Sequence, residues 1–154
     1  MALGGCALVQ QADEVPAPEA EAVVAPSAPA VRPPAARPPA NARTVEQFDT
    51  TSVAERQAAE AAAKAQAASG QGKALGRTVA SLGDATVPGL WLRTPLVSEA
   101  AMGRVVYPKT GKAVELELVP IEGAKTAGSQ ISLAALRVLE APLTDLSEVD
   151  VFIN

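Results

Sequence analysis

The chain has 154 residues, with 17 acidic and 13 basic side chains and a net charge of −4. No block of Lys and Arg is interleaved with aromatic residues, which argues against nucleic acid as a partner. Histidine is absent, and with it the commonest metal ligand and the commonest general base near neutral pH. We therefore expect no metal and no other cofactor.

Residues 1–10 contain Cys6, the single cysteine of the chain. The run Leu3-Gly4-Gly5-Cys6 resembles the lipobox of bacterial lipoproteins, in which the cysteine receives a diacylglycerol. The resemblance implies palmitate-type chains on Cys6 that hold the protein to a membrane, because two or three acyl chains make attachment effectively permanent. It also implies the cell envelope, on the periplasmic side, and Ala7 resembles the sorting signal for the outer membrane.

Only five residues precede Cys6, whereas such a signal has a basic segment and an apolar run of about 7–15 residues. We therefore expect the signal to begin upstream of Met1. An unmodified thiol in a cytosolic protein is the alternative.

Residues 11–45 are expected to form a disordered tether rich in Pro and Ala. Eight of the 13 prolines lie between Pro16 and Pro39, and such a segment favours polyproline II with a reach of about 100 Å. Its basic residues either keep the linker soluble or touch an anionic polymer or headgroup; they are Arg32, Arg37 and Arg43.

Residues 46–70 are expected to form an Ala-rich helix. Ser52 and Glu55 fit a capping box at its start, and Gly70 is placed to end it. Since no Leu or Ile marks a buried seam, we expect an exposed spacer rather than a packed helix.

Residues 75–154 hold the large apolar side chains of a compact domain. Alternating patterns and turn residues predict short strands at 78–80, 90–92, 104–107, 112–119 and 149–153. Pro108 to Gly111 reads as the turn of a hairpin. A short helix is expected from Ile131 to Glu140, capped by Ser129 or Ser132. This order indicates a mainly β fold with a small barrel and one short helix.

The segment from Gly103 to Val114, followed by a Gly-containing loop and the run from Ile131 to Leu136, resembles the second half of the double-psi β-barrel of rare lipoprotein A and its relatives. Members that act on peptidoglycan use an acidic residue just before the loop glycine, and Glu122 lies at that place. Ser132 stands where the family has an Asp, and the family's histidine has no counterpart. The resemblance therefore implies the fold more strongly than glycan cleavage.

The segments from Gly76 to Asp84 and from Pro88 to Leu92 resemble small bacterial lipoproteins, some of which carry the label D-galactarate dehydratase. Such a lyase needs a base that removes the proton beside the carboxylate, and usually a metal. Without His only scattered carboxylates remain, so the residues argue against this chemistry.

Four acidic residues and one aromatic residue were weighed as site candidates. Glu115 and Glu117 share a strand face, which an exposed sheet surface explains better than an acid/base pair. Asp84 lies in a Gly-Asp turn and is a turn former. Glu122 is the weak catalytic candidate, with a solvated loop charge as its alternative. Trp91 either stacks on a sugar or anchors the core.

Two hypotheses follow. In the first, an envelope lipoprotein uses a non-catalytic β domain to bind cell-wall glycan or an envelope protein. In the second, the domain is an enzyme, either a divergent peptidoglycan-cleaving barrel or a sugar-acid dehydratase. The residues favour the first.

Overall fold

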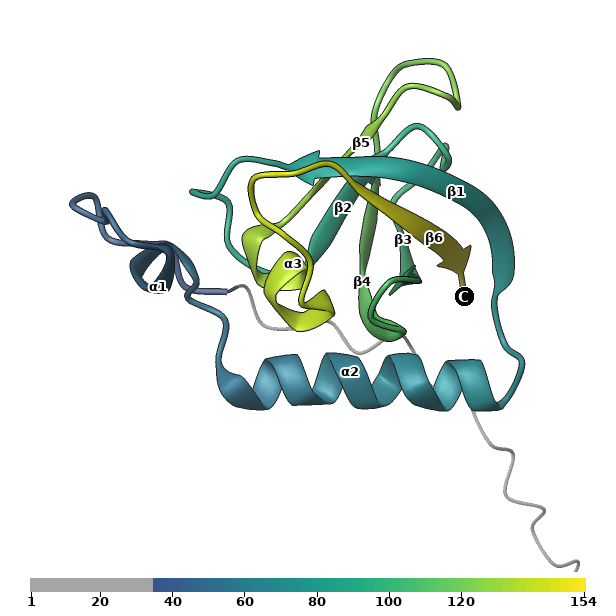
Figure 1. The fold of residues 1–154 in the computed structure, drawn as a ribbon, viewed down its shortest axis with the longest axis horizontal. Coiled ribbons are helices and arrows are strands. Elements are labelled where there is room, and N and C mark those ends of the chain that lie inside the picture. Colours follow the sequence, from purple (N-terminus) through teal and green to yellow (C-terminus); the bar gives the residue numbers. More distant parts are fainter. Residues whose placement is uncertain (1–34) are drawn as a thin grey trace, which may run out of the picture. The chain divides into compact units, whose positions relative to one another are not determined.

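A computed structural model of the protein describes residues 35–154, and Figure 1 shows their arrangement. Within this range six strands close into a barrel in the order β1-β5-β2-β4-β3-β6. The strands are β1 (Lys73–Leu82), β2 (Trp91–Thr94), β3 (Ala101–Tyr107), β4 (Lys112–Pro120), β5 (Ser129–Ile131) and β6 (Ser147–Ile153). The helices are α1 (Val45–Phe48), α2 (Val53–Ala68) and α3 (Leu133–Leu139). The predicted mainly β fold with a small barrel is confirmed.

The barrel combines parallel and antiparallel pairs. β1 pairs in parallel with β5, and β2 in parallel with β4. The remaining neighbours, β1 with β6, β2 with β5, β3 with β4 and β3 with β6, are antiparallel. Because parallel strands cannot be joined by a tight turn, the chain crosses over between each parallel pair.

The core fills the barrel with branched aliphatic side chains. On β4, Val114, Leu116 and Leu118 are fully buried, while Glu117 between them is exposed. This is the predicted alternation, and each such side chain contributes about 1.5–3 kcal/mol on burial. The hairpin of β3 and β4 is also confirmed, with Gly111 at φ +70° in its turn.

The segment around residue 131 differs from its predicted helix. Ser129–Ile131 forms the short strand β5, and α3 begins only at Leu133. Ser132 is the helix cap, and its hydroxyl accepts a hydrogen bond from the amide of Ala135 at 3.3 Å. Ser129 is not a cap, because it belongs to β5 and its hydroxyl lies inside a buried network with Thr94.

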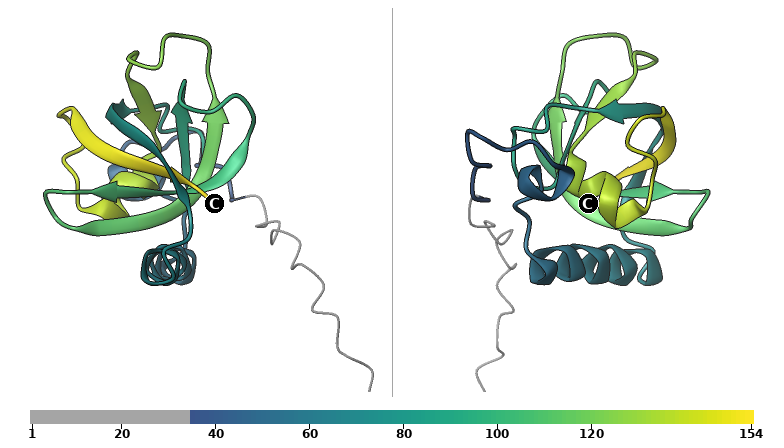
Figure 2. Two further views of the ribbon diagram at one scale, coloured as in Figure 1. Left: turned by 90° about the vertical axis from the view of Figure 1, so that its right-hand side faces the viewer. Right: turned by 60° about the vertical axis from the view of Figure 1, so that its left-hand side comes forward.

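Helix α2 begins at the predicted capping box, but residues 49–52 of the predicted helical range 46–70 are not helical, and α2 ends at Ala68. The Ser52 hydroxyl accepts from the Glu55 amide at 3.1 Å, and the Glu55 carboxylate accepts from the Ser52 amide at 2.7 Å, as a capping box requires. The expected exposed spacer is wrong, because Ala59 and Ala63 are 0% exposed and the helix packs on β4. Both views of Figure 2 show α2 along the outside of the barrel. An alanine face can pack without large apolar side chains, since the small side chain lets the helix backbone approach the strands closely.

The segment before α2 is fastened to the barrel unit. The side chain of Asp49 is 1% exposed, and its Oδ2 accepts from Arg56 Nη1 at 3.0 Å and from Arg137 Nη1 at 2.8 Å. Arg56 lies on α2 and Arg137 on α3. The buried carboxylate therefore joins residues 44–52 to both helices, and residues 35–45, which were assigned to the tether, belong to the compact unit that holds the barrel.

Candidate functional site

The structure buries Trp91, the predicted candidate for sugar stacking. The residue is 5% exposed, and its indole N–H donates to the carbonyl of Val87 at 3.2 Å. The guanidinium of Arg93 lies 4.8 Å from the centre of the ring, and a Cβ added at Gly83 would lie 3.0 Å from the ring carbon Cζ3. Trp91 is therefore buried in the core, which leaves little of its ring for a sugar to stack on.

Glu122 lies in the exposed loop between β4 and β5, which projects from the barrel in Figure 1. No residue in the described range donates a hydrogen bond to its carboxylate. Its accessible position fits either a solvated loop charge or a group that meets a ligand from outside. The predicted lipid attachment site, Cys6, lies outside the described residues.

The other carboxylates have local partners. Asp84 accepts hydrogen bonds from the hydroxyl of Thr86 at 2.6 Å and from its amide at 2.8 Å, and these bonds lower the pKa of Asp84 below its usual value. The turn role predicted for Asp84 is thus confirmed. Glu115 accepts a hydrogen bond from the side-chain amide of Gln66 on α2. Within residues 35–154, no group of three or more acidic or Cys side chains is arranged to hold a metal ion.

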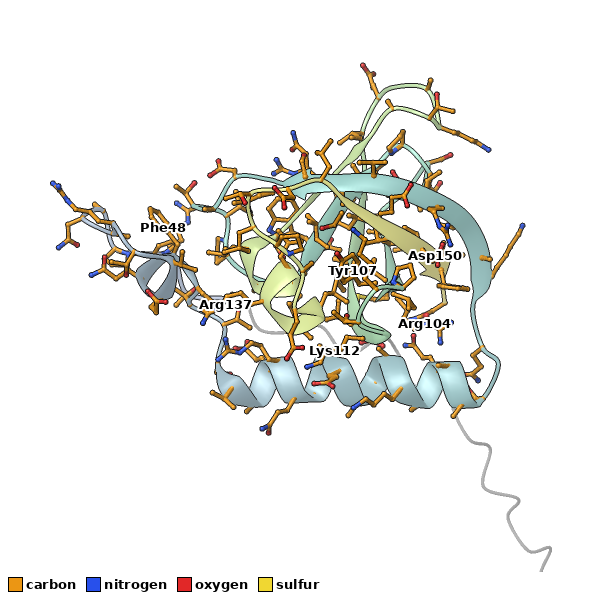
Figure 3. All side chains as sticks on the ribbon, in the orientation of Figure 1. Phe48, Arg104, Tyr107, Lys112, Arg137 and Asp150 are labelled. Carbon is orange, nitrogen blue, oxygen red and sulfur yellow. The ribbon has the colours of Figure 1, made fainter. Side chains whose placement is uncertain are left out.

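A groove with a volume of about 530 Å³ lies between residues 37–48 and the loop that precedes β2. We call it the Phe48 groove, after the aromatic residue in its wall. Figure 3 labels Phe48 at the end of α1. The lining residues are Arg37, Pro38, Pro39, Ala40, Ala42, Phe48, Thr86, Val87 and Pro88.

Local hydrogen bonds hold the first wall of the Phe48 groove. The side-chain oxygen of Gln47 accepts from the amides of Arg43 at 2.7 Å and Thr44 at 3.2 Å, which starts α1. Phe48 ends that helix, and its neighbour Asp49 makes the two buried ion pairs described above. The aromatic ring is therefore held at a fixed place although α1 has only one turn.

The opposite wall is the turn between β1 and β2. Asp84 binds Thr86 through side chain and backbone, and the amide of Val87 donates to the carbonyl of Asp84 at 3.2 Å. The same loop provides the carbonyl that accepts from Trp91. A buried core residue therefore fixes the loop that forms this wall.

The lining combines apolar surface with one cation. Phe48 is half-buried, the prolines and Val87 add apolar area, and the guanidinium of Arg37 is exposed. A ligand with an apolar face and a carboxylate would complement this lining, and the volume is in the usual range of small-ligand sites, about 300–1,000 Å³. The sequence interpretation missed Phe48 because residues 46–70 were assigned to an exposed spacer helix, and Arg37 to a tether. The available signal was an aromatic residue four positions before the predicted capping box.

Comparisons with known proteins identify no relative. The chain matches no protein-family model, no curated protein and no solved structure. In the range that the structure describes, none of the helices combines the length and the apolar character needed to span a bilayer. Inferences about function therefore depend on the barrel, the Phe48 groove and the sequence around Cys6.

Proposed function

We propose that the chain is a lipid-anchored protein of the bacterial cell envelope whose barrel unit binds cell-wall glycan in the Phe48 groove without cleaving it. Acyl chains on Cys6 would hold it on the periplasmic side, at the outer membrane. The observation that carries the binding proposal is the pairing of a half-buried aromatic ring, Phe48, with an exposed guanidinium, Arg37, in one groove.

The chemistry of cell-wall glycan complements this pairing. Its amino-sugar rings have apolar C–H faces that pack on aromatic side chains, and its lactyl and peptide groups end in carboxylates. Arg37 supplies a planar donor group that matches a carboxylate. The alternative role considered for Arg37, contact with an anionic polymer, is therefore the one that the groove favours. An envelope protein is the other partner that such a surface could take.

Co-sedimentation with purified insoluble peptidoglycan tests the proposal. Phe48→Ala and Arg37→Gln should each weaken binding at least about fivefold, since a central contact contributes about 1 kcal/mol or more. Leu146→Ala and Arg43→Gln are matched controls, because both positions are exposed and neither lines the Phe48 groove. Equal binding by all four variants, or no binding by the wild type, would contradict the proposal.

The lipid anchor has its own test. Bacteria that express the chain with its native upstream codons are fed a palmitate analogue, and the protein is isolated from membranes. The wild type should carry the label, and Cys6→Ser should lose both the label and the membrane association. Recovery of the wild type from the cytosol with a free thiol would refute the anchor and leave the groove proposal standing.

We also propose that the barrel is of the double-psi type found in rare lipoprotein A. Support comes from the closed barrel of six strands with two parallel pairs, β1 with β5 and β2 with β4, and from the resemblance between Gly103 and Leu139. An experimental structure whose crossovers do not form two interlocked psi loops would contradict this assignment.

Catalysis is the second candidate, favoured only by the accessible position of Glu122 before Gly123. The chain would then cleave glycan strands or dehydrate a sugar acid such as D-galactarate as a lyase. Turnover of either substrate that Glu122→Gln abolishes would establish it. Absence of turnover with both substrates would remove it.

A further inference from the structure

Arg104 in β3 is a buried cation in which two of the three guanidinium nitrogens have no acceptor. The residue is 7% exposed, and its Nε and Nη1 atoms are buried and have no hydrogen-bond partner. Its register neighbours are Glu115 on β4 and Phe152 on β6. Figure 3 shows it between β6 and the C-terminal end of α2. The N–H groups on Nε and Nη1 are thus enclosed without the acceptors that they would have in water.

Glu115, the register neighbour of Arg104 on β4, accepts a hydrogen bond from the side-chain Nε2 of Gln66 on α2. The Oε1 atom of Gln66 is itself buried without a partner. Within residues 35–154 no carboxylate forms an ion pair with Arg104, whereas Arg56 and Arg137 share Asp49.

One contact stabilises the guanidinium without satisfying its N–H donors. Its Cζ lies 4.4 Å from the centre of the Phe152 ring, which is a cation–π contact. The ring supplies an electrostatic attraction for the cation but no acceptor oxygen. This contact does not replace the hydrogen bonds lost on burial, and unpaired buried donors are rare in native proteins. Such local conflicts are concentrated at functional sites.

We propose that Arg104 is a binding site for a small oxyanion, a carboxylate or a phosphate group, whose oxygens accept hydrogen bonds from its guanidinium. The guanidinium of Arg104 can bind either anion, because its N–H donors lie in one plane and match two oxygens of a carboxylate or a phosphate. Phe152 holds that plane in place from one side. Neither residue lines the Phe48 groove, so this site and the proposed glycan site can fail independently.

The link between α2 and β1 lies beside Phe152. A Cβ added at Gly72 would lie 3.7 Å from Cβ of Phe152, the residue whose ring stacks on Arg104. Residues 69–72 are exposed, and Gly70 and Gly72 have φ angles of +66° and +100°. We infer that a small displacement of this link uncovers Arg104.

Thermal unfolding of the full chain in sodium phosphate, sodium acetate and sodium chloride at equal ionic strength tests the site. A ligand that binds only the folded state raises the unfolding midpoint. The midpoint of the wild type should rise by about 3 °C or more in millimolar phosphate or acetate relative to chloride. A response to phosphate alone would identify a phosphoryl group as the ligand, and an equal response to acetate a carboxylate.

Arg104→Met should abolish the response, while Arg93→Met should retain it. Arg93 is the matched control because its guanidinium also lies over an aromatic ring, that of Trp91. In chloride, Arg104→Met should be at least as stable as the wild type, because it removes an unpaired buried charge. Should Arg104→Met not fold, the proposal is refuted, since the guanidinium would then be needed for the fold itself. The same anion response in wild type and Arg104→Met, or no response in the wild type, would also overturn it.

Discussion

Replacing Ala63 by Leu tests the packing of α2 on the barrel. If α2 were an exposed spacer, Ala63 would face solvent, but in this structure the residue is 0% exposed. A leucine at this position must therefore displace β4 or push the helix away from it. Overpacking at such a site costs about 1–3 kcal/mol. With a urea dependence of about 1–3 kcal/mol per M, the midpoint of unfolding should fall by roughly 1 M.

Ala61→Leu provides the control, because Ala61 is exposed on the same helix. It adds the same apolar atoms with nearly the same helix propensity, so its effect should stay within about 0.5 kcal/mol. Urea unfolding is followed by the fluorescence of Trp91, the single tryptophan, and by circular dichroism of the helices. Equal midpoints for Ala61→Leu and Ala63→Leu would refute the packed helix and restore the spacer.

Three further predictions concern the barrel and its turns. Gly103→Ala should lower the free energy of unfolding by about 1–3 kcal/mol in urea titrations, because the new Cβ would lie 2.5 Å from the carbonyl oxygen of Phe152; an unchanged midpoint would contradict that close approach. Ser129→Ala should lower the free energy of unfolding by about 1–3 kcal/mol in the same assay, since the Ser129 hydroxyl is hydrogen-bonded to those of Thr78 and Thr94 at 2.9 Å each. A neutral effect would show that these buried hydrogen bonds are not formed. Hydrogen bonds from Thr86 lower the pKa of Asp84. The stability that these bonds contribute is therefore present above the ordinary pKa of Asp and is lost as pH falls through the lowered pKa of Asp84. An NMR titration should show the pKa of Asp84 rising in Thr86→Val, and an unchanged pKa would contradict the role of the Thr86 hydroxyl.

Local signals in the sequence predicted much of the barrel unit. The capping box at Ser52 and Glu55, the turn at Gly111 and the alternation along β4 depend on neighbouring residues only, and each is present in the structure. The predicted strand around Thr78 was too short. Its remaining residues are held by pairing with β6, which is distant in sequence.

Features that depend on tertiary contacts could not be predicted in the same way. The strand β5 has only three residues and exists because β1 and β2 flank it. The position of α2 was missed because its buried face consists of alanine alone. The burial of Arg104 has no local signal, since an Arg on a strand normally faces solvent.

The candidate site shows the same division. Glu122 and Trp91 were selected by residue type and local pattern, yet one projects from a loop and the other lies in the core. Phe48 and Arg37 were not selected as a pair, because their proximity depends on the buried ion pairs of Asp49, whose partners lie on two different helices. A single sequence does not reveal such a junction.

The most direct test of the central claim is an NMR titration of the ¹⁵N-labelled protein with soluble disaccharide-peptide fragments of the cell wall. Binding in the Phe48 groove predicts that amide shifts change in residues 37–48 and 84–88 and saturate with a single affinity, and that Phe48→Ala removes them. Unchanged spectra, or changes centred on the loop that carries Glu122, would contradict the account.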